Sequence, residues 1–364
     1  MAYIYFLMIE MRKQSYRWWP TVLALSIFLN ACSMRVMDAG PPIKFGGWVT
    51  YWDFKRGMVT ALKGNGIYRD IFLFSAQLDV DGTPIMVNSK GIDYRSAIGQ
   101  LKNSGIRTWM TIVNDVKSID GNKPILKDPQ IVHNILKNNT LRLKHRREII
   151  DLALKYGVSG IDIDYENLLP EDRVHFSRFI SELSSELKKR NLTLSVTVQP
   201  KTRNRDILGN AAMDWSEICR HADRLQIMLY NLHGKKTKPG PLATVNWISN
   251  VLRYAKSQCK FETIVPILKV SGMHWSPNKV TTVHYDQIVA LKNTHQALLE
   301  RETTSQVPFF SYKLNTGTGV VYFEDALSLK IKINHIFSMG FDKVVFWSLG
   351  RQDPLLASEL RDFL

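Results

Sequence analysis

Three carboxylates stand at alternate positions in residues 157–167, which read Gly-Val-Ser-Gly-Ile-Asp-Ile-Asp-Tyr-Glu-Asn. If this stretch forms a β-strand, Asp162, Asp164 and Glu166 leave one face and the apolar residues between them leave the other. Carboxylates this close repel one another when all are ionised, so we expect at least one to hold a proton near neutral pH. A carboxyl group that keeps its proton is what general acid catalysis needs.

An acidic strand has two other interpretations, a solvated sheet edge and a metal site. Isoleucines between the acids argue against an exposed edge. No histidine lies close in sequence to complete a common metal-ligand set, so we expect no metal and no other cofactor. Acid–base chemistry is therefore the favoured interpretation, with the carboxylates pointing into the interior of a closed sheet.

Strand-like and helical segments alternate along the chain around this stretch. Strands are expected over residues 44–52, 71–75, 107–113, 157–167, 192–198, 224–230, 263–268 and 343–347. Helices are expected over residues 57–63, 94–104, 129–156, 170–190, 215–222, 242–256, 323–339 and 353–364. This alternation predicts an α/β fold, the (β/α)₈ TIM barrel. An open doubly wound sheet is the alternative, but no glycine-rich phosphate turn follows the first strand.

The segment between the seventh strand and the last long helix, about 270–322, is too long for a plain loop. It contains a helical pattern near 285–301 and strand-like runs at 306–312 and 319–323. We therefore expect a small α+β insertion that lines one side of a cleft.

Active sites of such barrels form at the carboxyl ends of the strands, where the sequence puts Glu166. Other polar and aromatic residues are expected at comparable strand ends: Tyr51, Trp52, Gln77, Asn114, Gln199, Tyr230, Asn231 and Trp347. Such a ring suits a sugar, because aromatic faces cover ring C–H bonds while amides and acids bind hydroxyl groups. Taken singly, each aromatic is better explained by core packing than by sugar binding, and Trp347 is the favoured subsite residue.

The acidic stretch resembles the active-site strand of glycoside hydrolase family 18, whose pattern is Asp-x-x-Asp-x-Asp-x-Glu. The last three acids and the preceding Gly160 match, and Ser159 replaces the first Asp. Residues 226–231, Gln-Ile-Met-Leu-Tyr-Asn, are similar to the family's sixth strand, and residues 344–350 to its closing segment. The match runs in order over about residues 45–353.

The resemblance implies a retaining, substrate-assisted hydrolase of β-1,4-linked N-acetylglucosamine polymers, in which the substrate's acetamide replaces a protein nucleophile. Glu166 would protonate the glycosidic oxygen, and Asp164 would hold the acetamide N–H. Tyr230 would orient the acetamide carbonyl, and Asp162 would lie behind Asp164 and share its proton. The substrate-binding residues expected from the motifs and strand ends are Trp347, Asn231, Met228, Trp52, Tyr51, Asn114 and Gln199.

Two departures from the family pattern bear on activity. Ser159 removes the outermost acid, and Asn231 removes a charge after Tyr230. A catalytically inactive, lectin-like barrel and a purely structural lipoprotein are the alternatives, and the intact Glu166 argues against the first. Chitin, peptidoglycan and an N-glycan remain open as substrates.

The first 31 residues differ from the rest of the chain. Basic residues at 12, 13 and 17 precede the apolar run 22–29, and small residues lead to Cys32, an order typical of an export signal. The run is too short to span a bilayer. Cys32 resembles the lipidated cysteine of a bacterial lipoprotein, with a plain signal peptide or an uncleaved anchor as alternatives. We expect a signal over 1–31, a tether over 32–42 and the barrel over 43–364, anchored in the cell envelope through this lipid. In a Gram-negative cell the expected location is the outer membrane.

The chain carries a formal charge of +15 at pH 7, which favours anionic envelope polymers or lipid head groups as neighbours. Nucleic acid is a weaker interpretation, because no aromatic residues interleave with the basic runs. We expect a monomer that binds no nucleic acid. Cys219 and Cys259 can pair in an oxidising compartment, but two cysteines are no disulfide framework.

Overall fold

The computed structural model of the chain describes residues 45–87, 91–117, 124–203 and 209–364. The expected export signal, Cys32 and the tether lie outside these residues, and what was predicted for them stays a prediction.

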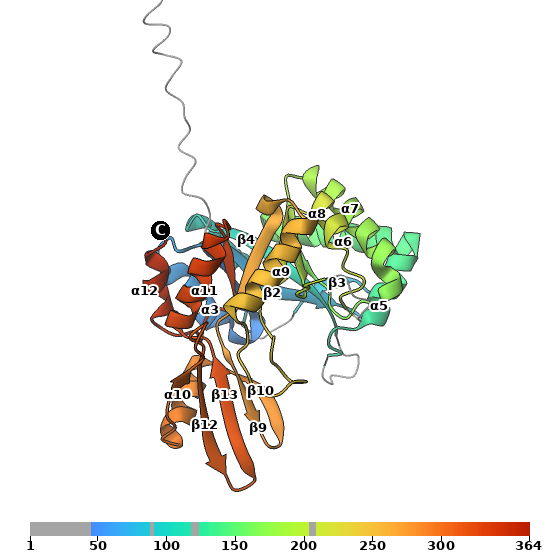
Figure 1. The fold of residues 1–364 in the computed structure, drawn as a ribbon. Helices are drawn as coiled ribbons and strands as arrows, with labels where there is room; N and C mark the ends of the chain where they lie inside the picture. Colours follow the sequence, from blue (N-terminus) through green and yellow to red (C-terminus); the bar gives the residue numbers. More distant parts are fainter. Residues whose placement is uncertain (1–44, 88–90, 118–123, 204–208) are drawn as a thin grey trace, which may run out of the picture. The chain divides into compact units, whose positions relative to one another are not determined.

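Eight parallel strands form a closed barrel, which confirms the predicted fold class. The sheet runs in the order β1-β14-β8-β7-β6-β5-β4-β2, and pairing of β1 with β2 closes the ring (Figure 1). A short strand, β3 (Pro84–Met86), pairs antiparallel with β2. The barrel strands are β1 (Phe45–Thr50), β2 (Tyr68–Leu78), β4 (Arg107–Val116), β5 (Gly160–Asp164), β6 (Thr193–Val198), β7 (Arg224–Met228), β8 (Ile264–Lys269) and β14 (Val344–Trp347).

Strand β5 carries the acidic motif into the barrel. Asp162 is in register with residues of β4 and β6 and is completely buried. Ile161 and Ile163 belong instead to the large hydrophobic core that the strands share with the helices. The alternation predicted from the sequence therefore holds, with acids inward and isoleucines outward. The strand ends at Asp164, so Glu166 lies in the loop at its carboxyl end.

Helices follow most strands and pack their apolar faces on the barrel. They are α3 (Phe54–Lys63), α4 (Tyr94–Asn103), α5 (Pro129–Lys137), α6 (Asn139–Tyr156), α7 (Arg173–Lys188), α8 (Trp215–His221), α9 (Val245–Gln258), α11 (Ala326–Ser338) and α12 (Leu356–Arg361), with 3₁₀ turns η1 (Tyr51–Asp53), η2 (Pro170–Asp172) and η3 (Phe261–Thr263). The single helix expected over 129–156 is two helices. Asn138 breaks it, because its side chain caps α6 by accepting from the N–H groups of Thr140 and Leu141.

The predicted insertion is a small antiparallel sheet with one helix, and this prediction is confirmed in kind. Its elements are β9 (Gly272–Ser276), β10 (Lys279–Val283), α10 (Tyr285–Thr294), β11 (Glu300–Arg301), β12 (Pro308–Leu314) and β13 (Gly317–Phe323), in the sheet order β10-β9-β13-β12-β11. The sequence did not predict the β9–β10 hairpin, because β10 shows no apolar alternation. Helix α10 packs through Ile288 on the sheet's own small core.

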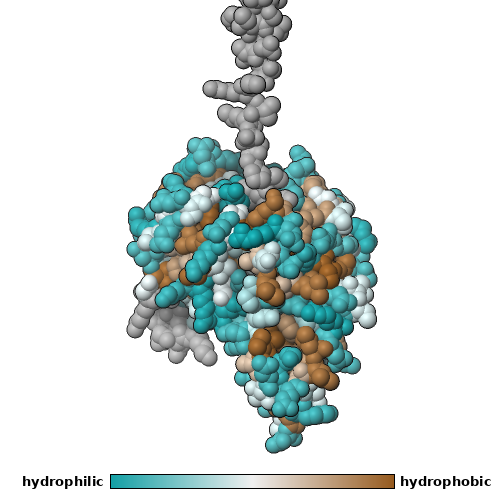
Figure 2. Space-filling model, turned by 90° about the vertical axis from the view of Figure 1, so that its left-hand side faces the viewer, coloured by the Kyte–Doolittle hydropathy of each residue, from teal (hydrophilic) through white to brown (hydrophobic). Residues whose placement is uncertain are grey.

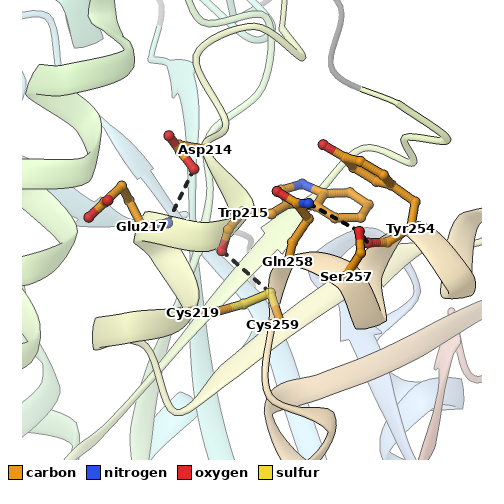
Figure 3. The surroundings of a disulfide bond; sticks show 8 residues. All are labelled: Asp214, Trp215, Glu217, Cys219, Tyr254, Ser257, Gln258 and Cys259. Carbon is orange, nitrogen blue, oxygen red and sulfur yellow. Dashed lines mark hydrogen bonds between the residues drawn. A yellow bond between two sulfur atoms is a disulfide. The ribbon is translucent and has the colours of Figure 1, made fainter.

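A disulfide joins helices α8 and α9 on the outside of the barrel (Figure 3). It links Cys219 to Cys259, the pairing that the sequence left open. The Cys259 Sγ also contacts the backbone oxygen of Trp215 at 3.4 Å, and the Trp215 ring packs against Tyr254. A structural disulfide is typical of proteins that fold in oxidising compartments.

Hydrophilic residues cover most of the face drawn in Figure 2, and apolar residues gather there in separate patches. The two most exposed of the large apolar side chains among the described residues, Leu298 and Val174, come from different parts of the fold. No helix in the described part of the chain is long and apolar enough to cross a membrane.

Candidate active site

Asp162 lies at the base of the site and is held by hydroxyl and amide groups from three neighbouring strands. Thr111 Oγ1 of β4 donates to its Oδ2 at 3.0 Å, and Thr197 Oγ1 of β6 donates to its Oδ1 at 3.0 Å. Gln226 Nε2 of β7 donates to Oδ1 at 3.2 Å, while Trp48 Nε1 donates to the Thr111 hydroxyl. Burial raises the pKa of Asp162, and its hydrogen bonds oppose that rise.

Asp164 occupies the next inward position along β5 and lines a cavity at the barrel mouth. Burial raises its pKa to about 8, with Lys127 opposing the rise and Glu166 and Asp162 adding to it. Asp164 therefore holds a proton at neutral pH, as expected for one member of the acidic cluster. Its Oδ1 atom is buried and has no hydrogen-bond partner, so it is free to bind a group that enters the cavity.

Glu166 follows the strand and is positioned through its backbone. Asn114 of β4 donates from Nδ2 to the Glu166 carbonyl at 2.9 Å and accepts from the Glu166 N–H at 2.9 Å. Gln199 Nε2 donates to Glu166 Oε2 at 3.1 Å. The neighbouring Tyr165 points away from the barrel interior, and its hydroxyl forms a 2.7 Å hydrogen bond with His145 Nε2 of α6. This contact helps to hold the loop that carries Glu166. The Glu166 carboxylate thus reaches the cavity on a braced loop.

Lys127 is a site residue that the sequence reasoning missed. Its Nζ lies 2.7 Å from Glu166 Oε1 and 3.8 Å from Asp164 Oδ2. The loop holds it at a positive φ of 56°, and its N–H donates to Asp115 Oδ1 at 2.9 Å. Burial opposes the charged ammonium, but Asp164 and Glu166 outweigh it and raise the pKa of Lys127. A lysine in the loop after β4 carries no motif, so the sequence offers no signal for it.

The cavity has a volume of about 400 Å³ and is lined by Trp48, Tyr51, Trp52, Phe74, Asp115, Leu126, Lys127, Asp164, Glu166, Thr197, Met228, Tyr230, Asn231, Ile267 and Trp347. All the predicted site residues within the described part of the chain line it, apart from three. Asp162 lies beneath it, while Asn114 and Gln199 bind Glu166 from outside the lining. Asn114 is completely buried with its amide engaged, which differs from the predicted contact with substrate. Gln77, also expected at a strand end, is not part of the lining.

Aromatic rings form one wall of the cavity. The Trp347 ring centroid lies 5.2 Å from that of Phe74 and 6.4 Å from that of Trp52, both at steep interplanar angles. Trp52 is 54% exposed, whereas Trp48 is buried below Trp347 and supports it. An exposed indole beside carboxylates can cover the apolar face of a sugar ring.

Tyr230 and Asn231 close the side of the cavity next to β7. Burial, together with the negative charges of Asp164, Glu166 and Asp162, raises the pKa of the Tyr230 hydroxyl. Tyr230 therefore stays neutral and keeps a proton that it can donate. Asn231 has a positive φ of 63°, a conformation that asparagine tolerates better than most residues. Among the described residues, no group of three or more His, Cys, Asp or Glu side chains could hold a metal ion.

Comparison with known proteins identifies a family and several relatives. The family model described as glycosyl hydrolases family 18 matches residues 118–353. The uncharacterized glycosylase YvbX of Bacillus subtilis (strain 168) is 25% identical over 305 residues, which cover 79% of this chain and 84% of that protein. The cortical fragment-lytic enzyme of Bacillus anthracis is 28% identical over 228 residues, or 60% of this chain. The matched region spans only 53% of that enzyme.

Solved structures share the fold at lower identity. A chitinase from Chromobacterium violaceum ATCC 12472 aligns with a TM-score of 0.78 and 21% identity, over 88% of this chain and 98% of the chitinase. At this identity the likeness concerns the fold alone.

Proposed function

Because the chain belongs to glycosyl hydrolases family 18, we propose that it hydrolyses β-1,4-linked N-acetylglucosamine-containing polysaccharide of the chitin or peptidoglycan type. The observation that carries the proposal is the joint presence of Asp164 and Glu166 in one cavity that also has an aromatic wall. The relative named as a cortical fragment-lytic enzyme supports this class of activity.

In the proposed mechanism Glu166 gives its proton to the glycosidic oxygen as the bond to the anomeric carbon breaks. The carbonyl oxygen of the substrate's 2-acetamido group attacks the anomeric carbon and forms an oxazolinium intermediate. The Glu166 carboxylate then takes a proton from water, whose oxygen opens the intermediate with overall retention of configuration. Asn114 and Gln199 keep the carboxyl group in position for both steps.

Asp164 would hold the acetamide N–H through its unpartnered Oδ1 and stabilise positive charge on the intermediate. Because its pKa is raised to about 8, Asp164 enters the reaction with a proton that must move as the charge develops. Asp162 lies behind it as the neighbouring acceptor, and Tyr230 would donate to the acetamide carbonyl. Trp347 would form the floor of the sugar subsite.

A further group of lining residues would contact the sugar ring and its substituents: Tyr51, Trp52, Met228 and Asn231. We propose that Asn114 and Gln199 act on Glu166 rather than on the substrate, since neither lines the cavity.

A carbohydrate-binding barrel without turnover is the second candidate, and one observation favours it. Lys127 Nζ lies 2.7 Å from Glu166 Oε1, so the carboxyl group that must donate a proton is paired with an ammonium group. For hydrolysis, the entering substrate must therefore displace the ammonium from Glu166 or neutralise it.

We also propose export, with a lipid on Cys32 that anchors the barrel to the envelope membrane. The order of basic residues, apolar run and cysteine motivates this, and the Cys219–Cys259 disulfide supports an oxidising compartment. We propose that the protein works as a monomer and binds no nucleic acid.

The test is incubation of the purified protein with chitin oligomers and with peptidoglycan, followed by mass analysis of the products. We expect shorter oligomers with reducing-end N-acetylglucosamine or N-acetylmuramic acid. Tight binding of both glycans without any product would instead support the binding barrel.

A further inference from the structure

A second groove, of about 330 Å³, lies beside the catalytic cavity. It is lined by Asn231, Gly234, Lys235, Lys236, Thr237, Lys269, Met273 and Thr282. Its walls come from the loop after β7, the end of β8 and the β9–β10 hairpin of the insertion. Asn231 borders both spaces, so the groove adjoins the catalytic cavity.

Three lysines give this groove its charge. Lys235 and Lys236 are exposed, whereas Lys269 is only 7% exposed. None of the ion pairs between described residues involves any of the three. Among the described residues, the Lys269 ammonium makes one hydrogen-bond contact, with Met273 Sδ at 3.9 Å. Glu324 is the acid whose negative charge acts on Lys269, but its carboxylate already accepts hydrogen bonds from Lys332 and Ser328.

Lys269 is aimed at the groove by its strand. It follows Ile267, a cavity residue, by two positions on β8, so both side chains leave the same face. Its register partner on β14 is Trp347, the residue proposed as the floor of the sugar subsite. The buried ammonium therefore lies one strand away from that indole, at the barrel mouth.

A buried cation without a counter-charge is costly to keep. The pKa of Lys269 is lowered to about 8, mainly by burial and to a smaller extent by the positive charge of Lys235. The group is still mostly protonated at neutral pH. An anion in the groove would restore the missing partner to Lys269 and screen its repulsion from Lys235.

We propose that this lysine groove is a subsite for a carboxylate carried by the glycan, so the preferred substrate is acidic rather than neutral. The inference rests on the proposed function, because it assumes that the catalytic cavity holds an N-acetylated sugar. Two sources supply such a carboxylate in a peptidoglycan-type polymer, the lactyl ether of the sugar and the peptide attached to it. A neutral glycan such as chitin would leave the three ammonium groups unpaired.

Binding by calorimetry separates this inference from catalysis. We would use the Glu166→Gln protein, so that the glycan is not cut, and peptide-free glycan strands with free lactyl carboxylates. The comparison ligand is the same strands after carbodiimide coupling to a neutral amide. A charge-assisted hydrogen bond contributes enough to predict about a 10- to 100-fold tighter Kd for the charged strands. The preference should shrink as salt is added.

Lys269→Gln should reduce this ratio of Kd values about tenfold or more. The double variant Lys235→Gln/Lys236→Gln provides a second test on exposed positions that folding does not depend on. Lys238→Gln is the matched control, because Lys238 is exposed in the same loop but does not line the groove. It should leave the ratio unchanged.

Strands that keep their peptides identify the source of the carboxylate. Tighter binding of the peptide-free strands assigns the groove to the lactyl group, and tighter binding of peptide-bearing strands assigns it to the peptide. Equal Kd values for charged and amidated strands would refute the proposed carboxylate subsite, whichever glycan the enzyme cleaves. Absence of cleavage by the unaltered protein would overturn the proposed function and leave the binding result intact.

Discussion

Replacement of Lys127 by methionine removes the one cation among the described residues that pairs with both cavity carboxylates. Its Nζ lies 3.8 Å from Asp164 Oδ2, and its positive charge lowers the pKa of Asp164 against the rise due to burial. Two unit charges about 4 Å apart interact by about 1 kcal/mol with water-like screening and by about 4 kcal/mol near a protein surface. One pKa unit corresponds to about 1.4 kcal/mol. The pKa of Asp164 should therefore rise from about 8 by about one to three units.

The assay is the pH dependence of kcat/KM on a chitin oligomer or another glycan that the protein cleaves. The acid limb reports ionisation of the Asp162–Asp164 pair in the free enzyme, because Asp164 must give up its proton to stabilise the charged intermediate, so Lys127→Met should move that limb upward. Lys117→Met is the matched control, since Lys117 is exposed just after β4 and does not line the cavity. An acid limb that stays in place, or moves downward, would refute the link between Lys127 and Asp164.

Three further predictions concern stability and location. Asp164 has a raised folded-state pKa, so its contribution to stability is present below pH about 4 and is lost as the pH rises through about 8. Denaturant titrations should show Asp164→Asn flattening that fall, and a parallel pH dependence would contradict it. The disulfide links two cysteines 40 residues apart in sequence, so a Cys219→Ser/Cys259→Ser variant should have a free energy of unfolding lower by about 4 kcal/mol. An unchanged denaturation midpoint would argue against this. Cys32→Ser should release the protein from membranes washed in high salt, and retention would count against a lipid anchor.

The barrel and the acidic strand were predictable because their signals are local. Period-two alternation in β5 fixes which side chains enter the barrel, and Gly157 ends the preceding helix in a left-handed conformation that glycine adopts freely. Strand ends gather at one rim of a barrel, which is why Trp347 and Tyr230 could be assigned to the same site before the structure.

What the sequence could not supply depends on loop conformation and on long-range pairing. Lys127 reaches Glu166 only because its loop turns through a positive φ and is tied to Asp115. Asn114 was expected to bind substrate, but its side chain is used on the Glu166 backbone, a contact across 52 residues of sequence. The groove around Lys269 forms between β8 and a hairpin that shows no apolar alternation, so no local sequence pattern predicts it.

The central claim, that Glu166 is the proton donor and Asp164 the partner of the acetamide, is tested most directly with an aryl glycoside of N-acetylglucosamine oligomers. General acid catalysis contributes about 10²- to 10⁴-fold, so Glu166→Gln should lose at least that much on unactivated oligomers while still binding them. An aryl leaving group needs little protonation and should restore much of that loss. Asp164→Asn should stay impaired on both substrates, because its defect lies in holding the charged intermediate. Equal rescue of the two variants would contradict this division of roles, and full activity of Glu166→Gln on unactivated oligomers would contradict the hydrolase itself.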